Sequence, residues 1–281
     1  MTETAALTVD LELFGQTPAY RSATGRSGRQ TTPDTAREEA GVDGVRFLLD
    51  AFDGADATST FFAVSSLADS HGDLLRAVAD AGHEIGSHTR THRRLPELSP
   101  AEQRAELRDS RTELAAAVDG NVTGFRAPVF ELADDHFGAL AEAGYRYDSS
   151  VLPSRAIPGW YDGEYDTMRP CPASEIDPAA PPGIDELPVG VMPGLGLPLT
   201  GTWVRFFGRR YTLLGMRLLA RRGIAPVLYI HPWELVDLPD VDGVPARVYW
   251  RTGAWMRRTV ETVLEAGFEF VTARRLLESD G

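Results

Sequence analysis

The unit that decides the fold spans residues 67–92 and reads LADSHGDLLRAVADAGHEIGSHTRTH. Its first part, Leu67–Ala81, is predicted to form a helix that stops at Gly82, a residue suited to the left-handed conformation that follows many helices. His83–His88 is predicted as a short strand, and His92 lies just beyond it. Two imidazoles four residues apart after an apolar run can offer two nitrogen ligands to one transition metal, although this spacing alone is a weak indication.

The same alternation of helix and strand recurs about seven times along the chain. Strands are predicted near residues 7–10, 58–64, 83–88, 122–126, 145–150, 226–231 and 268–271, with a further one near 187–192. This order predicts a parallel sheet with outer helices, either a doubly wound open sheet or a barrel. No internal repeat or linker interrupts it, so we expect one domain over residues 1–281, with long loops at about 14–33 and 153–183.

The composition of the chain limits which partners and which cellular compartment we expect. The net charge of −13 argues against nucleic acid as a partner, and all 28 cationic residues are arginine. No apolar run approaches the roughly 20 residues that span a bilayer, and the N-terminus does not resemble a signal peptide. With a single cysteine, Cys171, these features predict a cytoplasmic protein.

Five polar side chains stand at the ends of predicted strands. They are Asp10, His88, Arg126, Asp148 and His231. The carboxyl ends of parallel strands meet at one edge of a sheet or one mouth of a barrel, and active sites of such folds form there. Polar groups from five strands therefore indicate one active site rather than five unrelated surface residues.

Each candidate also has an ordinary structural interpretation. Asp10 and Glu12 could cap a turn, or could supply a general base and a metal ligand, because two histidines and a carboxylate are an attested zinc set. Arg126 could be a surface ion-pair partner, or could hold a carboxylate ionised and oriented. His231 could be a hydrogen-bonded core residue or the acid that protonates a leaving group, and Trp233 could pack in the core or stack on a sugar.

Residues 204–222 are predicted to form one helix with two unlike faces. An apolar stripe contains Phe207, Tyr211, Leu214 and Leu218, and the other side carries Arg205, Arg209, Arg210, Arg217 and Arg221. The simplest interpretation is an outer helix with a solvated basic face. The alternative is a surface that docks against phosphates or an anionic membrane.

Four motifs in order resemble the polysaccharide deacetylases, which are the NodB-like carbohydrate esterases. The motifs are Thr8-Val9-Asp10, Ser87-His88-Thr89-Arg90-Thr91-His92, Arg126-Ala127-Pro128 and His231-Pro232-Trp233-Glu234. The resemblance covers nearly the whole chain and is closest to the branch found at exopolysaccharide loci. It implies a distorted (β/α) barrel of about seven parallel strands with outer helices, and a divalent metal.

The resemblance also implies a role for each site residue. Asp10 would be the general base, oriented by Arg126, and His231 the general acid. His88 and His92 would bind the metal, and the backbone N–H of Val129 would hold the oxyanion. The best candidate for the carboxylate partner of His231 is Asp148.

The first motif departs from the family pattern, in which a second, adjacent aspartate binds the metal. Leu11 occupies that position and cannot be a ligand, so Glu12 is the predicted third ligand. Zinc is the expected metal, and cobalt, nickel or manganese are alternatives.

The resemblance implies amide hydrolysis of an N-acetylated sugar or glycan. Because a signal peptide is not evident, we expect a nucleotide-linked or lipid-linked sugar rather than an extracellular polymer. The sequence does not indicate an oligomeric state. Two other functions stay open on the same fold: a metal-independent cyclic amidase of the allantoinase kind, and a non-catalytic protein that binds a glycan or a lipid phosphate.

Overall fold

A mostly parallel sheet forms the centre of the protein, which is described here by a computed structural model covering residues 3–25, 37 and 39–280. The strand order is β10-β1-β2-β3-β4-β5-β7-β6, and β11 pairs with β1. All the pairs are parallel except β6 with β7. The strands are β1 (Thr4–Leu11), β2 (Thr60–Ala63), β3 (Glu84–Ser87), β4 (Gly124–Phe125), β5 (Tyr147–Asp148), β6 (Cys171–Pro172), β7 (Asp185–Glu186), β10 (Val227–Ile230) and β11 (Glu269–Phe270); β8 (Val191–Met192) and β9 (Leu197–Pro198) form a separate pair.

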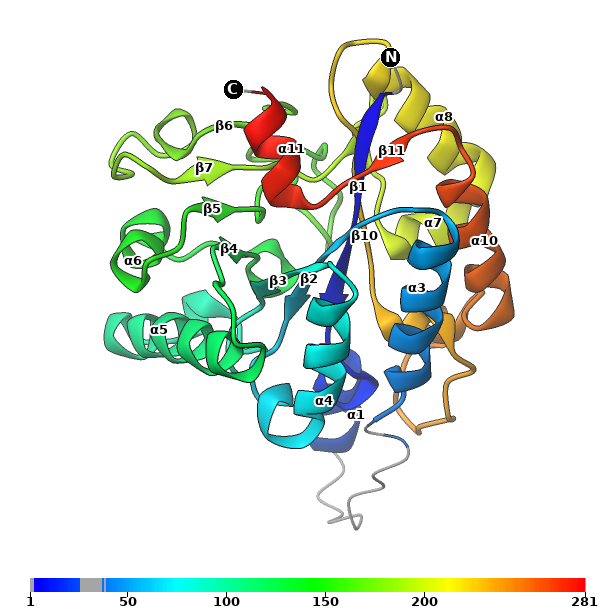
Figure 1. The fold of residues 1–281 in the computed structure, drawn as a ribbon, viewed down its shortest axis with the longest axis horizontal. Helices are drawn as coiled ribbons and strands as arrows, with labels where there is room; N and C mark the ends of the chain where they lie inside the picture. The colour runs from blue at the N-terminus through cyan, green and yellow to red at the C-terminus, as the bar shows by residue number, and fades with distance from the viewer. Residues whose placement is uncertain (1–2, 26–36, 38, 281) are drawn as a thin grey trace.

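Helices surround the sheet, which curls into an open barrel (Figure 1). They are α1 (Pro18–Gly25), α3 (Val42–Gly54), α4 (Leu67–Asp80), α5 (Pro100–Ala117), α6 (His136–Ala143), α7 (Gly201–Phe207), α8 (Arg209–Ala220), α9 (Ala246–Tyr249), α10 (Ala254–Leu264) and α11 (Ala273–Asp280). In Figure 1, α5 and α6 lie on one side of the sheet and α8 and α10 on the other. The predicted distorted (β/α) barrel with outer helices is confirmed.

Local sequence signals explain several helix ends. The Ser99 hydroxyl oxygen accepts a hydrogen bond from the backbone N–H of Glu102, the Glu102 carboxylate accepts one from the Ser99 N–H, and Pro100 opens α5. Gly82 has φ +84°, so the left-handed residue expected after Leu67–Ala81 is present.

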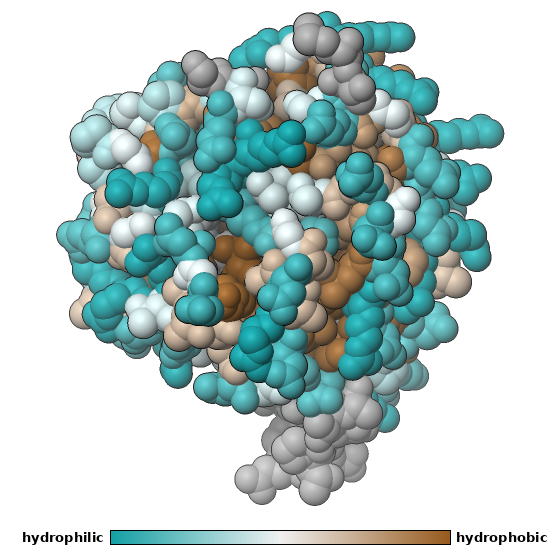
Figure 2. All heavy atoms as spheres, viewed as in Figure 1, coloured by the Kyte–Doolittle hydropathy of each residue, from teal (hydrophilic) through white to brown (hydrophobic). Residues whose placement is uncertain are grey.

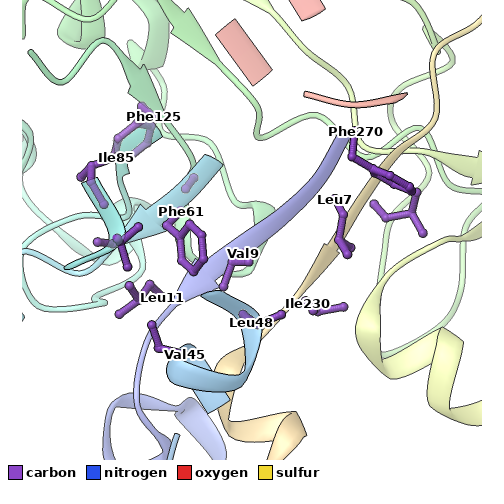
Figure 3. Close-up of a cluster of buried hydrophobic side chains, with 14 of the residues drawn as sticks. Leu7, Val9, Leu11, Val45, Leu48, Phe61, Ile85, Phe125, Ile230 and Phe270 are labelled. Atoms are coloured by element: carbon purple, nitrogen blue, oxygen red, sulfur yellow. The ribbon is translucent and has the colours of Figure 1, made fainter. Parts of the chain in front are cut away.

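Strand β1 divides its side chains between two environments. Leu7, Val9 and Leu11 point into the hydrophobic core beneath α3, where Figure 3 shows Leu11 beside Val45. Thr8 and Asp10 point to the interior of the barrel, where the Arg126 guanidinium donates to their side-chain oxygens. Because successive side chains of a strand alternate between its faces, the same strand supplies both core and site.

One of the two expected loops contains a helix. Helix α1 lies within the predicted loop 14–33. It begins after Thr17, whose hydroxyl accepts a hydrogen bond from the Tyr20 N–H, and the Tyr20 ring packs on Phe14. The rest of that predicted loop, from residue 26 on, lies outside the described residues. The other expected loop, residues 153–183, contains the short strand β6, an isolated bridge between Ile157 and Tyr161, and a turn at Ala173–Glu175.

The single helix predicted over residues 204–222 is wrong. It breaks at Gly208 into α7 and α8, since Gly208 has φ +84° and ψ 172°, which an L-residue rarely adopts. Consequently Arg205 is buried, and Phe207 and Leu214 of the expected apolar stripe are exposed. The face of α8 that packs inward carries Thr212, Gly215, Met216 and Leu219 instead.

Most of the surface in view is hydrophilic, with smaller hydrophobic areas between the polar side chains (Figure 2). Within the described residues, no helix has the length and apolar character needed to cross a bilayer.

Substitution of Gly44 tests how closely α3 approaches the turn Pro232–Leu235, which follows β10 and His231. A Cβ at position 44 would lie 2.0 Å from the carbonyl oxygen of Pro232, so Gly44→Ala forces helix and turn apart. We expect it to lower the free energy of unfolding by roughly 1–3 kcal/mol. Urea denaturation measures this.

Gly54→Ala is the matched control on the same helix, because a Cβ there meets no atom within 4 Å. It should leave the free energy of unfolding unchanged or raise it by about 0.5 kcal/mol. Equal stability of the two variants would contradict the close packing of α3 on the turn.

Candidate active site

A cavity of about 620 Å³ opens at the carboxyl ends of β1, β3 and β10. Predicted site residues that line it are Asp10, Glu12, His88, His92, Val129, His231 and Trp233. Residues from four separate parts of the sequence therefore meet in one place. The two remaining predicted residues, Arg126 and Asp148, are fully buried.

Glu12 reaches the cavity because β1 ends in a tight turn. The Glu12 N–H donates to the carbonyl oxygen of Asp10 at 2.9 Å, which returns the chain toward the barrel interior after Leu11. Oε2 of Glu12 lies 2.8 Å from Nε2 of His92, and Oε1 accepts a hydrogen bond of 3.1 Å from the indole N–H of Trp233. The carboxylate thus stands beside a predicted metal ligand, whereas the Leu11 side chain lies in the core.

The two histidines are fixed from different sides. His88 donates from Nδ1 to the carbonyl oxygen of Arg126 at 2.7 Å, because a carbonyl oxygen can only accept, and its Nε2 is left with a lone pair. His92 has φ +55° and follows a loop whose Thr91 donates from both N–H and hydroxyl to Glu106 of α5. The two rings lie 4.9 Å apart between centroids.

Arg126 holds Asp10 in place. Its Nη1 donates to Oδ1 of Asp10 at 2.7 Å and to the hydroxyl of Thr8 at 2.8 Å, and the Phe62 ring lies 4.2 Å from its Cζ. Its other nitrogens donate to the carbonyl and hydroxyl oxygens of Ser149. The geometry expected for an arginine that orients a carboxylate is present.

His231 is partnered by Glu234 rather than by Asp148. Its Nδ1 lies 3.4 Å from Oε2 of Glu234, which also accepts from the His231 backbone N–H. The other oxygen of Glu234 accepts from Nε of Arg205 at 2.8 Å, and this pair is buried. The spacing of three residues in His-Pro-Trp-Glu was a signal for this contact that the sequence analysis did not use.

Asp148 belongs to a different cluster, so its expected place beside His231 is corrected. Its Oδ2 lies 2.9 Å from Nε2 of His136, a residue to which the sequence analysis gave no role. Its Oδ1 accepts from the hydroxyl of Ser150, which in turn accepts from the N–H of Ala127. Asp148 therefore supports the turn that leads to Val129.

Val129 presents a backbone donor to the cavity. It lies in the turn Pro128–Phe130 with φ +54°, a rare conformation for a β-branched residue. Within the described part of the chain, its N–H donates to no protein acceptor. A free N–H on a cavity wall is the kind of group that stabilises an oxyanion.

Burial and neighbouring charges set the protonation states of the site. Burial raises the pKa of Glu12, but the charge of His92 and those of His231 and His88 outweigh it and lower the pKa to about 2. Burial lowers the pKa of His88 to about 4 despite Asp10. Near neutral pH, Glu12 is therefore ionised and His88 neutral.

His231 is shifted in the opposite direction. Burial lowers its pKa, but the hydrogen bond and charge of Glu234 and the charges of Glu12 and Asp10 raise it above the usual value. The pKa of Glu234 is lowered, because Arg205 and His231 outweigh its burial. His231 is thus suited to carry a proton, as a general acid requires.

The donor set fits a divalent metal in its chemistry. Nδ1 of His92 is buried without a hydrogen-bond partner, Nε2 of His88 presents a lone pair, and Oε2 of Glu12 lies 2.8 Å from Nε2 of His92. Two imidazoles and a carboxylate are an attested set for zinc. As the side chains stand, no group of three His, Cys, Asp or Glu within the described residues is arranged so that it could already hold a metal ion.

Two family models match successive parts of the chain. Residues 34–147 match the model described as polysaccharide deacetylase, and residues 149–278 match a domain of unknown function, DUF3473. The first match includes β3 and its histidines, and the second includes His231 and the turn after it.

Curated relatives match about half of this chain or less. A peptidoglycan deacetylase of Helicobacter pylori is 27% identical over 137 residues, which is 48% of this chain and 46% of the relative. A chitin deacetylase of Arthroderma benhamiae is 33% identical over 103 residues, or 35% of this chain and 28% of the relative. The chain thus spans less than half the length of these relatives.

Solved structures share the fold over nearly the whole chain. A probable polysaccharide deacetylase from Pseudomonas aeruginosa has a TM-score of 0.65 at 18% identity, covering 99% of this chain and 90% of that one. The allantoinase PuuE has a TM-score of 0.66 at 20% identity, with the same coverage of 99% and 90%. BA3943 of Bacillus anthracis, a CE4 family pseudoenzyme, has a TM-score of 0.51 at 13% identity and coverage of 98% and 66%.

Glu234→Gln tests the partner of His231. Removing the carboxylate charge removes the largest of the interactions that raise the pKa of His231, so we expect that pKa to fall toward its usual value. Histidine ¹H–¹³C NMR titration of the purified protein measures it directly.

The variant also leaves the buried Arg205 without its partner, which should destabilise the fold by roughly 3–5 kcal/mol. The double variant Arg205→Gln/Glu234→Gln removes both charges, and we expect it to regain most of that stability while the His231 pKa stays low. An unchanged His231 pKa in both folded variants would rule out Glu234 as its partner.

Proposed function

We propose that this chain, which belongs to the polysaccharide deacetylase family, hydrolyses the N-acetyl group of an acetamido sugar or glycan and releases acetate. Its family is the one predicted from the four sequence motifs, and the narrower exopolysaccharide-locus branch stays a prediction. The observation that carries the proposal is the meeting of Asp10, His231 and the set Glu12, His88 and His92 around one cavity.

The residues divide the work of amide hydrolysis between them. Asp10, held by Arg126, takes a proton from the water that attacks the acetyl carbonyl carbon. The N–H of Val129 donates to the oxygen that becomes negative in the tetrahedral intermediate. His231 then gives its proton to the sugar nitrogen as the C–N bond breaks, which yields acetate and a free amino sugar.

The metal would be held by Glu12, His88 and His92, and we propose zinc. When bound, a divalent ion polarises the acetyl carbonyl and makes a water molecule more acidic. The ionised Glu12 and the neutral His88 are already in the protonation states that ligands need. The carbonyl oxygen of Arg126 fixes the His88 tautomer, as second-sphere groups of metal sites do.

The two other functions have less support. The fold alone does not distinguish these functions from deacetylation, because an allantoinase and a pseudoenzyme have the same fold. A metal-independent amidase has no need of a carboxylate placed 2.8 Å from one of two histidines at the cavity floor. A protein that only binds glycans has no need of a buried Arg126–Asp10 pair beside a histidine whose pKa is raised.

Asp10→Asn should abolish most of the activity, and circular dichroism checks that the variant is folded, because Arg126 loses the charge of its carboxylate partner. A general base contributes about 10²- to 10⁴-fold to a rate, so we expect a loss of that size in acetate release from N-acetylglucosamine oligomers supplied with Zn²⁺, Co²⁺ or Mn²⁺. If wild-type protein releases no acetate from any N-acetylated sugar under these conditions, the proposed function is wrong.

Glu12→Ala tests the third ligand through metal content rather than activity. We expect wild-type protein to bind about one Zn²⁺ and the variant to lose at least tenfold in affinity, measured by isothermal titration and elemental analysis. Asp10→Asn is the matched control, since it removes a carboxylate charge from the same cavity and should keep the metal. Full occupancy in Glu12→Ala would exclude Glu12 as a ligand.

A further inference from the structure

Exposed aromatic side chains gather near the mouth of the cavity. Trp160, Phe206, Phe207 and Trp250 are 41%, 36%, 50% and 53% exposed. Trp160 lines the cavity, and its ring lies 6.3 Å from that of Phe206. Trp250 is tied to α7, because its carbonyl oxygen accepts from the Arg205 guanidinium. Large aromatic surfaces left in water near a site often mark a place of contact.

Several arginines without an ion-pair partner lie in the same part of the chain as these aromatic residues. Residues 188–233 contain six arginines and no Asp or Glu, although the chain as a whole carries a net charge of −13. Five of the six are exposed: Arg222, and four that lie on α8 or at its C-terminal end, namely Arg209, Arg210, Arg217 and Arg221. Within the described residues, none of these four has a carboxylate within 4 Å, not even Glu261 or Glu265 of the neighbouring α10.

Exposed arginine and apolar side chains alternate along α8. Arg210, Leu214, Arg217 and Arg221 follow one another at helical spacing, and Leu214 is 52% exposed. Arg209 and Arg210 also stand at the helix N-terminus, where the partial positive charge of the helix adds to theirs. This end of α8 therefore attracts anions, and an exposed leucine, Leu214, lies one turn further along the helix.

We propose that this surface docks onto a membrane that carries anionic lipids. The α7–α8 face, as we name it, consists of Trp160, Phe206, Phe207, Leu214, Trp250, Arg209, Arg210, Arg217, Arg221 and Arg247. Aromatic rings partition to the interface between lipid headgroups and acyl chains, and arginines pair with lipid phosphates. Each arginine near an anionic surface strengthens binding by about fivefold.

A membrane suits the face better than a dissolved polyanion does. A long polyanion would be repelled by the remainder of an acidic protein, whereas a flat bilayer meets only the local basic face. Binding of a dissolved polyanion through the arginines alone would also not explain why Phe207, Leu214 and Trp250 are exposed. If the proposed deacetylase function holds, docking brings the cavity beside Trp160 to the headgroup level, where a lipid-linked N-acetyl sugar would be presented.

Vesicle co-sedimentation tests the docking without any catalysis. Wild-type protein should bind phosphatidylcholine vesicles that contain about one-third phosphatidylglycerol, and should bind pure phosphatidylcholine at least tenfold more weakly. Arg210→Glu/Arg217→Glu should lower binding to the anionic vesicles by about 25-fold or more. Phe207→Ser/Leu214→Ser should also lower it, although the charge of the protein is unchanged.

The matched control is Arg76→Glu/Arg108→Glu, which makes the same charge change at exposed positions on α4 and α5, away from α8 (Figure 1). It should bind the anionic vesicles within about twofold of wild type. Equal binding of wild type to both kinds of vesicle, no binding to either, or heparin binding without vesicle binding would overturn the proposal. Because Asp10→Asn should bind vesicles normally, failure of docking and failure of the deacetylase function are separate results.

Discussion

The guanidinium of Arg126 lies fully buried inside the barrel and joins the carboxyl ends of separate strands. It donates to Thr8 and Asp10 of β1 and to Ser149 just after β5, and the Phe62 ring of β2 covers it. Its own carbonyl oxygen accepts from His88. A buried arginine without its carboxylate would cost roughly 3–5 kcal/mol, so the position of Asp10 is tied to the stability of the fold. The proposed general base, one proposed metal ligand and the barrel interior thus depend on one residue.

The alternation of β1 explains how the chain tolerates leucine at the second position of its first motif. Leu11 fills the core beneath α3, and the tight turn after it carries Glu12 back to the cavity. A carboxylate is therefore still supplied beside His92, from one residue further along. Trp233 lies next to Glu12, because the indole N–H of Trp233 donates a hydrogen bond to the other carboxylate oxygen of Glu12.

The sequence was sufficient for the barrel and for most of the cavity because these depend on local patterns. Helix–strand alternation predicts a parallel sheet, and strand ends predict where polar groups meet. Contacts between side chains of distant segments could not be predicted from these local patterns. Asp148 was assigned to His231 because it ends a strand, but the structure pairs it with His136 and pairs His231 with Glu234. Arg205 was placed on a solvated helix face because the break at Gly208 and the buried Glu234 were not anticipated.

The account depends most on Glu12 acting as the third ligand in place of the residue at position 11. Crystals grown with zinc and measured at the zinc absorption edge would locate the ion directly. We predict one anomalous peak at the cavity floor, about 2.0–2.2 Å from a carboxylate oxygen of Glu12 and from one nitrogen of each of His88 and His92. The absence of a peak there, or a peak bound by the two histidines and Asp10 with Glu12 turned away, would contradict the account.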